Sequence, residues 1–78
     1  DMPGMFSGMY NLTSLDLSGF DTSKVTNMSY MFMFDEKLTS VAYGEKFVKN
    51  ASLDFSGMFN NCPANKPTDS SWDGATYS

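Results

Sequence analysis

Few residues of this sequence could take part in catalysis. Cys62 is the single cysteine among the 78 residues, and neither histidine nor arginine is present. Without histidine there can be no His-based zinc site, no imidazole general base and no Ser-His-Asp triad. With no imidazolium or guanidinium available to lower its pKa, Cys62 is predicted to be a buried structural thiol and not a nucleophile. We therefore expect no enzymatic activity and no cofactor.

One cluster of oxygen-bearing side chains has the spacing of a metal-binding loop. Asp69, Ser71 and Asp73 occupy alternate positions and are followed by Gly74, as in the first half of a calcium loop. The chain given ends at Ser78, before the twelfth-position Glu that would complete such a loop. Because Asp-Gly is also a common turn dipeptide, we predict a polar turn and no metal here, with calcium binding as the alternative.

The charge and hydropathy of the chain exclude two classes of partner. The formal net charge is −4, whereas nucleic acids and anionic membrane surfaces both require a basic face. The longest apolar run, residues 31–34, is far too short to cross a bilayer. We expect no nucleic-acid partner and no membrane insertion of this fragment.

An internal repeat determines how these residues are placed. The dipeptide Met-Phe begins at Met5, at Met31 and at Met58, which gives spacings of 26 and 27 residues. Between these dipeptides the segments 12–17 and 38–43 also align with a spacing of 26. The first reads L-x-x-L-x-L, the strand segment of a leucine-rich repeat. The sequence therefore predicts two parallel strands, one in each repeat unit.

The remainder of each unit has helical spacing. Val25, Met28, Met31 and Phe32 fall at i, i+3, i+6 and i+7, which predicts a helix with one apolar face. The fold class predicted is α/β: a leucine-rich-repeat-like solenoid fragment, with short parallel strands stacked on one side, helices on the other, and a polar C-terminal cap. Such units bury their apolar edges only by stacking on their neighbours.

The repeat also predicts the organisation of the chain. The repetitive region spans 1–62, with units at about 5–30 and 31–57 and the start of a third. The segment 63–78 is a polar C-terminal cap or tail, whose large apolar residues are Trp72 and Tyr77. The first unit lacks a preceding strand, so its apolar side chains should be exposed for self-association or for covering by further units. These side chains are Met2, Met5, Phe6 and Met9.

The stretch from Leu15 to Phe32, with its Leu-Asp-Leu, Val-Thr-Asn-Met and Met-Phe elements, resembles a known repeat. It is similar to the terminal repeats of BspA-like bacterial leucine-rich-repeat surface proteins, of the type found in mycoplasma lipoproteins. The resemblance covers residues 2 to about 62. It implies an extracellular or cell-surface protein, a repeat used for display or adhesion, and repeats without enzymatic activity.

Two hypotheses for the function follow. The first is a surface-exposed repeat module that binds a protein or a glycan, and the second is a structural spacer or cap of a longer array with no ligand of its own. Under the first hypothesis, the binding surface consists of the outward positions of the two strands, because alternate strand residues point away from the core. These positions are Thr13, Ser14, Asp16, Ser18, Thr39, Ser40 and Ala42.

Overall fold

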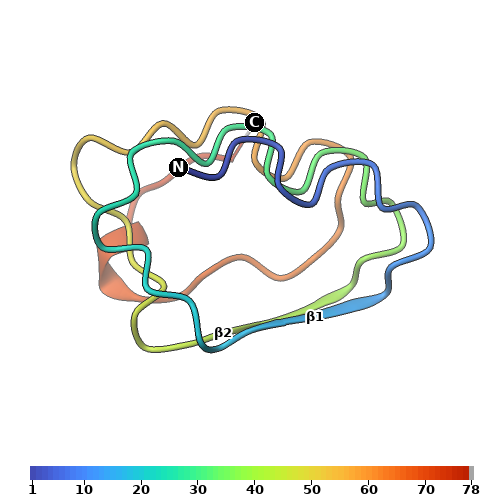
Figure 1. The fold of residues 1–78 in the computed structure, drawn as a ribbon, viewed down its shortest axis with the longest axis horizontal. Helices are drawn as coiled ribbons and strands as arrows, with labels where there is room; N and C mark the ends of the chain where they lie inside the picture. Colours follow the sequence, from blue (N-terminus) through green and yellow to red (C-terminus); the bar gives the residue numbers. More distant parts are fainter. Residues whose placement is uncertain (78) are drawn as a thin grey trace.

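The computed structural model describes residues 1–77, and its regular elements are few (Figure 1). Strands β1 (Ser14–Leu17) and β2 (Ser40–Tyr43) form a two-stranded parallel sheet, and a 3₁₀ helix, η1 (Ser70–Trp72), lies near the C-terminus. Each residue of β1 lies opposite the residue 26 positions later in β2. The prediction of two parallel strands is therefore confirmed, and the register equals the first period of the sequence repeat.

The wall opposite the strands is made of three rows of β-turns that run side by side (Figure 1). We call residues 2–8, 28–34 and 55–61 the first, second and third turn rows. Each turn is closed by a hydrogen bond between residues three apart, as from the Met31 N–H to the Met28 carbonyl at 3.2 Å. The chain thus runs along nearly the same path three times.

Hydrogen bonds between the rows hold them in register. Alternate N–H groups of one row donate to carbonyls of the next, as from Phe6 to Met31 at 3.0 Å and from Phe32 to Met58 at 2.9 Å. The bridge between Asn27 and Asp54 belongs to the same parallel arrangement. Backbone polar groups that a helix would satisfy internally are satisfied here by the neighbouring row.

The predicted α/β solenoid with helices on one side is wrong. Within residues 1–77 the structure contains no α-helix. Val25 closes an earlier turn by donating its N–H to the Thr22 carbonyl, and from Met28 onwards the predicted helix is replaced by the turns of the second row. In two of these turns the third residue has a positive φ, 59° at Tyr30 and 65° at Phe34, which interrupts any helical path. Glycine or asparagine occupies each equivalent position of the other rows, also with positive φ: Gly4, Gly8, Gly57 and Asn61.

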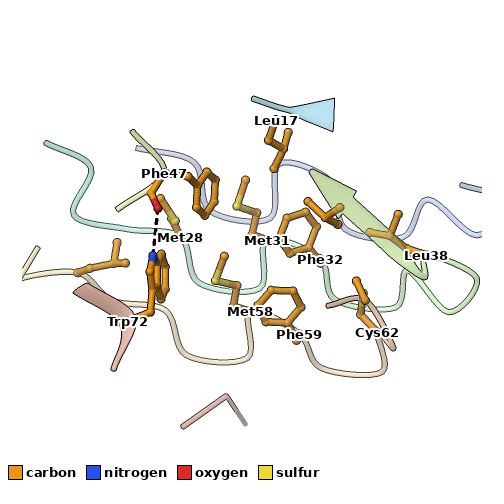
Figure 2. Packing of buried hydrophobic residues seen from close by; sticks show 13 residues of the cluster. Leu17, Met28, Met31, Phe32, Leu38, Phe47, Met58, Phe59, Cys62 and Trp72 are labelled. Atoms are coloured by element: carbon orange, nitrogen blue, oxygen red, sulfur yellow. Dashed lines mark hydrogen bonds between the residues drawn. The ribbon is translucent and has the colours of Figure 1, made fainter. Parts of the chain in front are cut away.

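The core lies between the turn rows and the strands and is layered in the same period (Figure 2). The rings of Phe6 and Phe32 stack with centroids 5.9 Å apart, and those of Phe32 and Phe59 with centroids 5.1 Å apart. Tyr77 ends this column by an edge contact with Phe59 at 5.0 Å. The side chains most completely removed from solvent include Leu17, Met28, Met31, Phe32, Leu38, Phe47 and Met58.

The C-terminal segment covers the last row and the free edge of β2. The Asn65 side chain accepts the Val41 N–H at 2.7 Å and donates to the Val41 carbonyl at 2.9 Å, as a neighbouring strand would. The buried Trp72 ring stacks on Phe47 at 5.9 Å and donates its Nε1–H to the Phe47 carbonyl (Figure 2). A single amide side chain therefore takes the place of a third strand.

Candidate binding face

The seven outward strand positions predicted as a binding surface are all exposed. The sheet register brings them together in pairs, with Ser14 beside Ser40 and Asp16 beside Ala42. We call this set the polar strip; it consists of Thr13, Ser14, Asp16, Ser18, Thr39, Ser40 and Ala42. Its side chains are short, so the strip is a shallow surface without a wall at which a ligand could be enclosed.

Two of the polar strip's side chains are already bonded within the protein. The Thr39 hydroxyl and N–H both point to the Thr13 carbonyl, at 3.4 and 3.0 Å. The Asp16 carboxylate accepts the Ser18 N–H at 2.9 Å. Hydrogen bonds from the side chain and backbone of Ser18 lower the pKa of Asp16, so the strip carries a fixed negative charge at neutral pH.

A recurring turn that the sequence reasoning did not include uses six aspartate and asparagine side chains. In each case a side-chain oxygen accepts the N–H of the serine two residues later, as from Ser56 to Asp54 at 3.0 Å. The signal was present as Asx-x-Ser triplets, a known turn-forming pattern. The side chains so engaged are Asp16, Asp21, Asn27, Asn50, Asp54 and Asp69. Their oxygens position the backbone of the repeat.

The same turn accounts for the calcium-like segment. The Asp69 carboxylate accepts the Ser71 N–H at 2.8 Å and caps the start of η1. Hydrogen bonds from the side chain and backbone of Ser71 lower the pKa of Asp69. Among residues 1–77 the structure brings no three acidic, histidine or cysteine side chains together in a metal-binding group. The Asp69 side chain thus has a structural role as the cap of η1.

A hollow that the sequence analysis did not foresee lies just beyond the carboxyl ends of β1 and β2. Its volume is about 330 Å³, and it adjoins the polar strip through Ser18. It is lined by Ser18, Gly19, Phe20, Glu45 and Lys46. The periodicity placed the flanking strands correctly, but it gave no signal that the connections after them leave a hollow at the surface.

The N-terminal apolar face is only partly open. Met5 and Met9 are exposed, whereas Met2 and Phe6 are half-buried and pack against the core. A second hollow, of about 440 Å³, lies beside this face and is lined by Met9, Tyr10, Asn11 and Leu12. The exposed apolar side chains form a limited patch and not a continuous open layer.

Two titratable side chains are withdrawn from the surface at equivalent positions of neighbouring repeats. Cys62 is a buried free thiol, and burial raises its pKa. Asp35 is fully buried, and one carboxylate oxygen accepts the Met9 N–H at 2.8 Å, while the other has no hydrogen-bond partner. Burial raises the pKa of Asp35 as well. Neither side chain is presented to a ligand.

The family model described as "Mycoplasma protein of unknown function, DUF285" matches residues 1–77. The chain belongs to the DUF285 family. No curated protein and no solved structure matches it. Membership in DUF285 agrees with the mycoplasma-type repeat inferred from the sequence, but it does not show a BspA-like or leucine-rich-repeat protein. Within residues 1–77, no helix is long and apolar enough to cross a membrane.

Proposed function

We propose that this DUF285 repeat is a non-enzymatic module of a cell-surface or secreted bacterial protein, and that the polar strip binds a protein or glycan ligand. The observation that carries the proposal is the alignment of exposed side chains across the sheet, Ser14 with Ser40 and Asp16 with Ala42. Parallel strands of a repeat present such positions as one continuous surface, which lengthens as further repeats are added.

The distribution of reactive groups supports a function without catalysis. The thiol of Cys62 and the carboxylate of Asp35 are buried, and the remaining aspartates engaged in Asx-x-Ser turns hold the backbone. Catalysis would require a nucleophile or an acid–base group that is presented to a substrate, and the burial of Cys62 and Asp35 does not present them in this way. Binding requires only an accessible surface of defined shape, which the polar strip provides.

The proposal is tested by screening the purified protein against a glycan array and a panel of purified extracellular-matrix proteins. Asp16→Lys reverses a fixed charge in the middle of the polar strip and should abolish or strongly weaken retention of a ligand. Glu36→Lys makes the same charge change at an exposed loop position outside the strip and serves as the matched control. Equal loss in both variants, or no ligand for the folded protein, contradicts the proposal.

The open side of the first turn row favours the alternative, a spacer in a longer repeat array. In the second row the carbonyls of Asn27, Ser29, Met31 and Met33 accept N–H groups from the first row. In the first row the equivalent carbonyls accept no hydrogen bond from the described residues; they belong to Asp1, Pro3, Met5 and Ser7. A further turn row would supply the missing donors.

The same geometry restricts self-association through this face. Two copies related by a two-fold axis would place the carbonyls of one first row against those of the other, and neither would provide donors. We propose that any self-association here uses the apolar patch at Met5 and Met9 and not a shared turn ladder. Sedimentation analysis of Met5→Lys checks this: the variant should shift any dimer of the protein towards monomer. Unchanged association would exclude the patch.

A further inference from the structure

The hollow beyond the carboxyl ends of the strands has a rigid frame. Its two walls follow β1 and β2 directly, and the backbones approach so closely that a Cβ at Gly44 would overlap the Ser18 carbonyl. The Thr22 N–H also donates to the Lys46 carbonyl at 3.0 Å, and the Thr22 hydroxyl donates to the Val48 carbonyl at 2.8 Å. The walls are therefore fixed by backbone contacts, as in a preformed site.

The lining of the hollow combines an aromatic face with polar groups. Phe20 is half-buried, and its ring is supported from the core side by Phe6, whose centroid lies 6.4 Å away. Gly19 leaves open space, because a Cβ there would have no neighbour within 4 Å. Glu45 and Lys46 are exposed and bring one hydrogen-bond acceptor group and one donor group to the rim.

The charge around the hollow selects against charged ligands. Glu45 and Lys46 carry opposite charges and leave the rim neutral. The nearby Asp21 has a pKa lowered by hydrogen bonds from the side chain and backbone of Ser23, and to a lesser extent by Lys46 and Lys24. The negative charge of Asp21 acts on Lys46 through space and weakens the attraction of its ammonium group for an anion. The affinity for a neutral ligand with many hydrogen-bond donors and acceptors is not reduced by these opposing charges.

The size of the hollow is sufficient for a ligand of one ring. Its volume of about 330 Å³ is at the lower end of small-molecule sites. A sugar residue has an apolar C–H face that fits against an aromatic ring and hydroxyl groups that both donate and accept hydrogen bonds. We propose that this hollow binds a single neutral sugar residue of a glycan, with Phe20 beneath the ring and Glu45 and Lys46 at its hydroxyls. This rests on the proposed function and specifies its ligand class and subsite.

The test is a titration of the folded protein with methyl β-galactoside, methyl α-glucoside and N-acetylglucosamine, followed by amide chemical shifts. At least one of these sugars should give saturable shifts at residues 18–20 and 45–46. Glu45→Gln, which removes the charge from an acceptor, and Phe20→Leu, which removes the aromatic face, should each weaken binding about tenfold, the effect of ~1.4 kcal/mol. Glu36→Gln is the matched control and should leave binding unchanged. The fluorescence of Trp72 confirms folding of each variant.

Three results would overturn the inference: shifts that do not saturate, shifts that map elsewhere, or binding that Glu45→Gln leaves intact. Saturation of the same amides by glycine instead of a sugar would also overturn it, since the hollow would then take a zwitterion. The proposed function is judged separately. If a ligand from the array is lost in Asp16→Lys but retained in Glu45→Gln and Phe20→Leu, the sugar subsite is wrong and the polar strip stands. If the array yields no ligand either, both fail.

Discussion

The segments that directly follow β1 and β2, here called the two strand exits, contain Ser18 and Gly44. Replacing Gly44 by alanine tests whether the two strand exits pack backbone against backbone. A Cβ at this position would overlap the carbonyl oxygen of Ser18 and lie 2.8 Å from its carbonyl carbon and 3.0 Å from its Cα. No flexible side chain is involved, so the overlap can be relieved only by moving one strand exit away from the other. The displacement would disturb the end of the β1–β2 pairing.

The expected loss is large for a protein of this size. Overpacking costs typically about 1–3 kcal/mol, and contact with fixed backbone places Gly44→Ala near the upper value. At roughly 0.05–0.15 kcal/mol per residue, the total free energy of unfolding of a chain of 78 residues is about 4–12 kcal/mol. A change of about 3 kcal/mol should lower the Tm by roughly 12–24 °C, from about 4–8 °C per kcal/mol for a small domain.

Gly19→Ala, in the segment that follows β1, is the matched control. A Cβ there has no neighbour within 4 Å, and the φ of Gly19 is not in the positive range that strains alanine. Alanine restricts the unfolded chain without strain in the folded one, so Gly19→Ala should stabilise by about 0.4–1 kcal/mol. Urea unfolding followed by the fluorescence of Trp72, the single tryptophan, measures both variants because its ring is buried in the native state.

The two substitutions should therefore change the free energy of unfolding in opposite directions. A loss below about 1 kcal/mol in Gly44→Ala, the lower limit for overpacking, would refute the close approach of the strand exits. A loss of equal size in both variants would refute the reasoning in another way, since it would show a general cost of alanine after these strands and not a specific contact.

Three further substitutions test other contacts. Asp35→Asn should stabilise the protein, and the gain should grow with pH. The pKa of Asp35 is raised above 3.8 in the native state, so the contribution of this side chain to stability is complete below the unfolded pKa and is lost as pH rises through the native pKa. Urea unfolding of the wild-type protein and the variant over a pH series measures the difference. Asn65→Ala should cost about 1–3 kcal/mol, because the N–H and carbonyl of Val41 lose their partner, and faster amide exchange at Val41 would check the cause. Trp72→Phe should cost about 1 kcal/mol through loss of the hydrogen bond to the Phe47 carbonyl; no measurable loss in thermal melting would contradict that bond.

The strands were predictable because their alternation of apolar and polar residues is compatible only with an extended chain. Leu15 and Leu17 alternate with Asp16, and only an extended chain places such a set on two faces. The repeat spacing of 26 then fixed the register, since equivalent residues of stacked units must lie side by side. The repeat-locked apolar positions were also predicted correctly as core: Met28, Met31 and Phe32 are fully buried.

The turn rows were not predictable from the same reasoning. The spacing of Val25, Met28, Met31 and Phe32 suits one face of a helix, but it also suits consecutive β-turns that place every third or fourth residue inwards. Gly4 and Gly57 at equivalent positions were a signal for positive φ, but the intervening repeat has Tyr30 there, a residue type that seldom adopts it.

The candidate site likewise has one part that the sequence predicted and one part that it did not. Exposure of the polar strip follows from strand alternation, whereas the hollow depends on how the segments after β1 and β2 pack together. Lys46 lies 26 residues after Phe20, so the repeat spacing brings the two segments together, but it does not report the space that opens between them. The Asx-x-Ser turns were visible as triplets, but their use as turns in place of ligands depends on local backbone geometry.

The sequence by itself determined the period, the parallel strand pair and its register, and the apolar residues of the core, because each follows from spacing along the chain. The tertiary structure alone decided between a helix and a turn row. That choice depends on whether an N–H such as that of Phe32 donates to a carbonyl four residues earlier or to Met58 in the next row. The acceptor one repeat away exists only after the rows have stacked, so no local propensity reports it. The hollow beside the polar strip has the same origin, since its walls meet only when the two strand exits pack together.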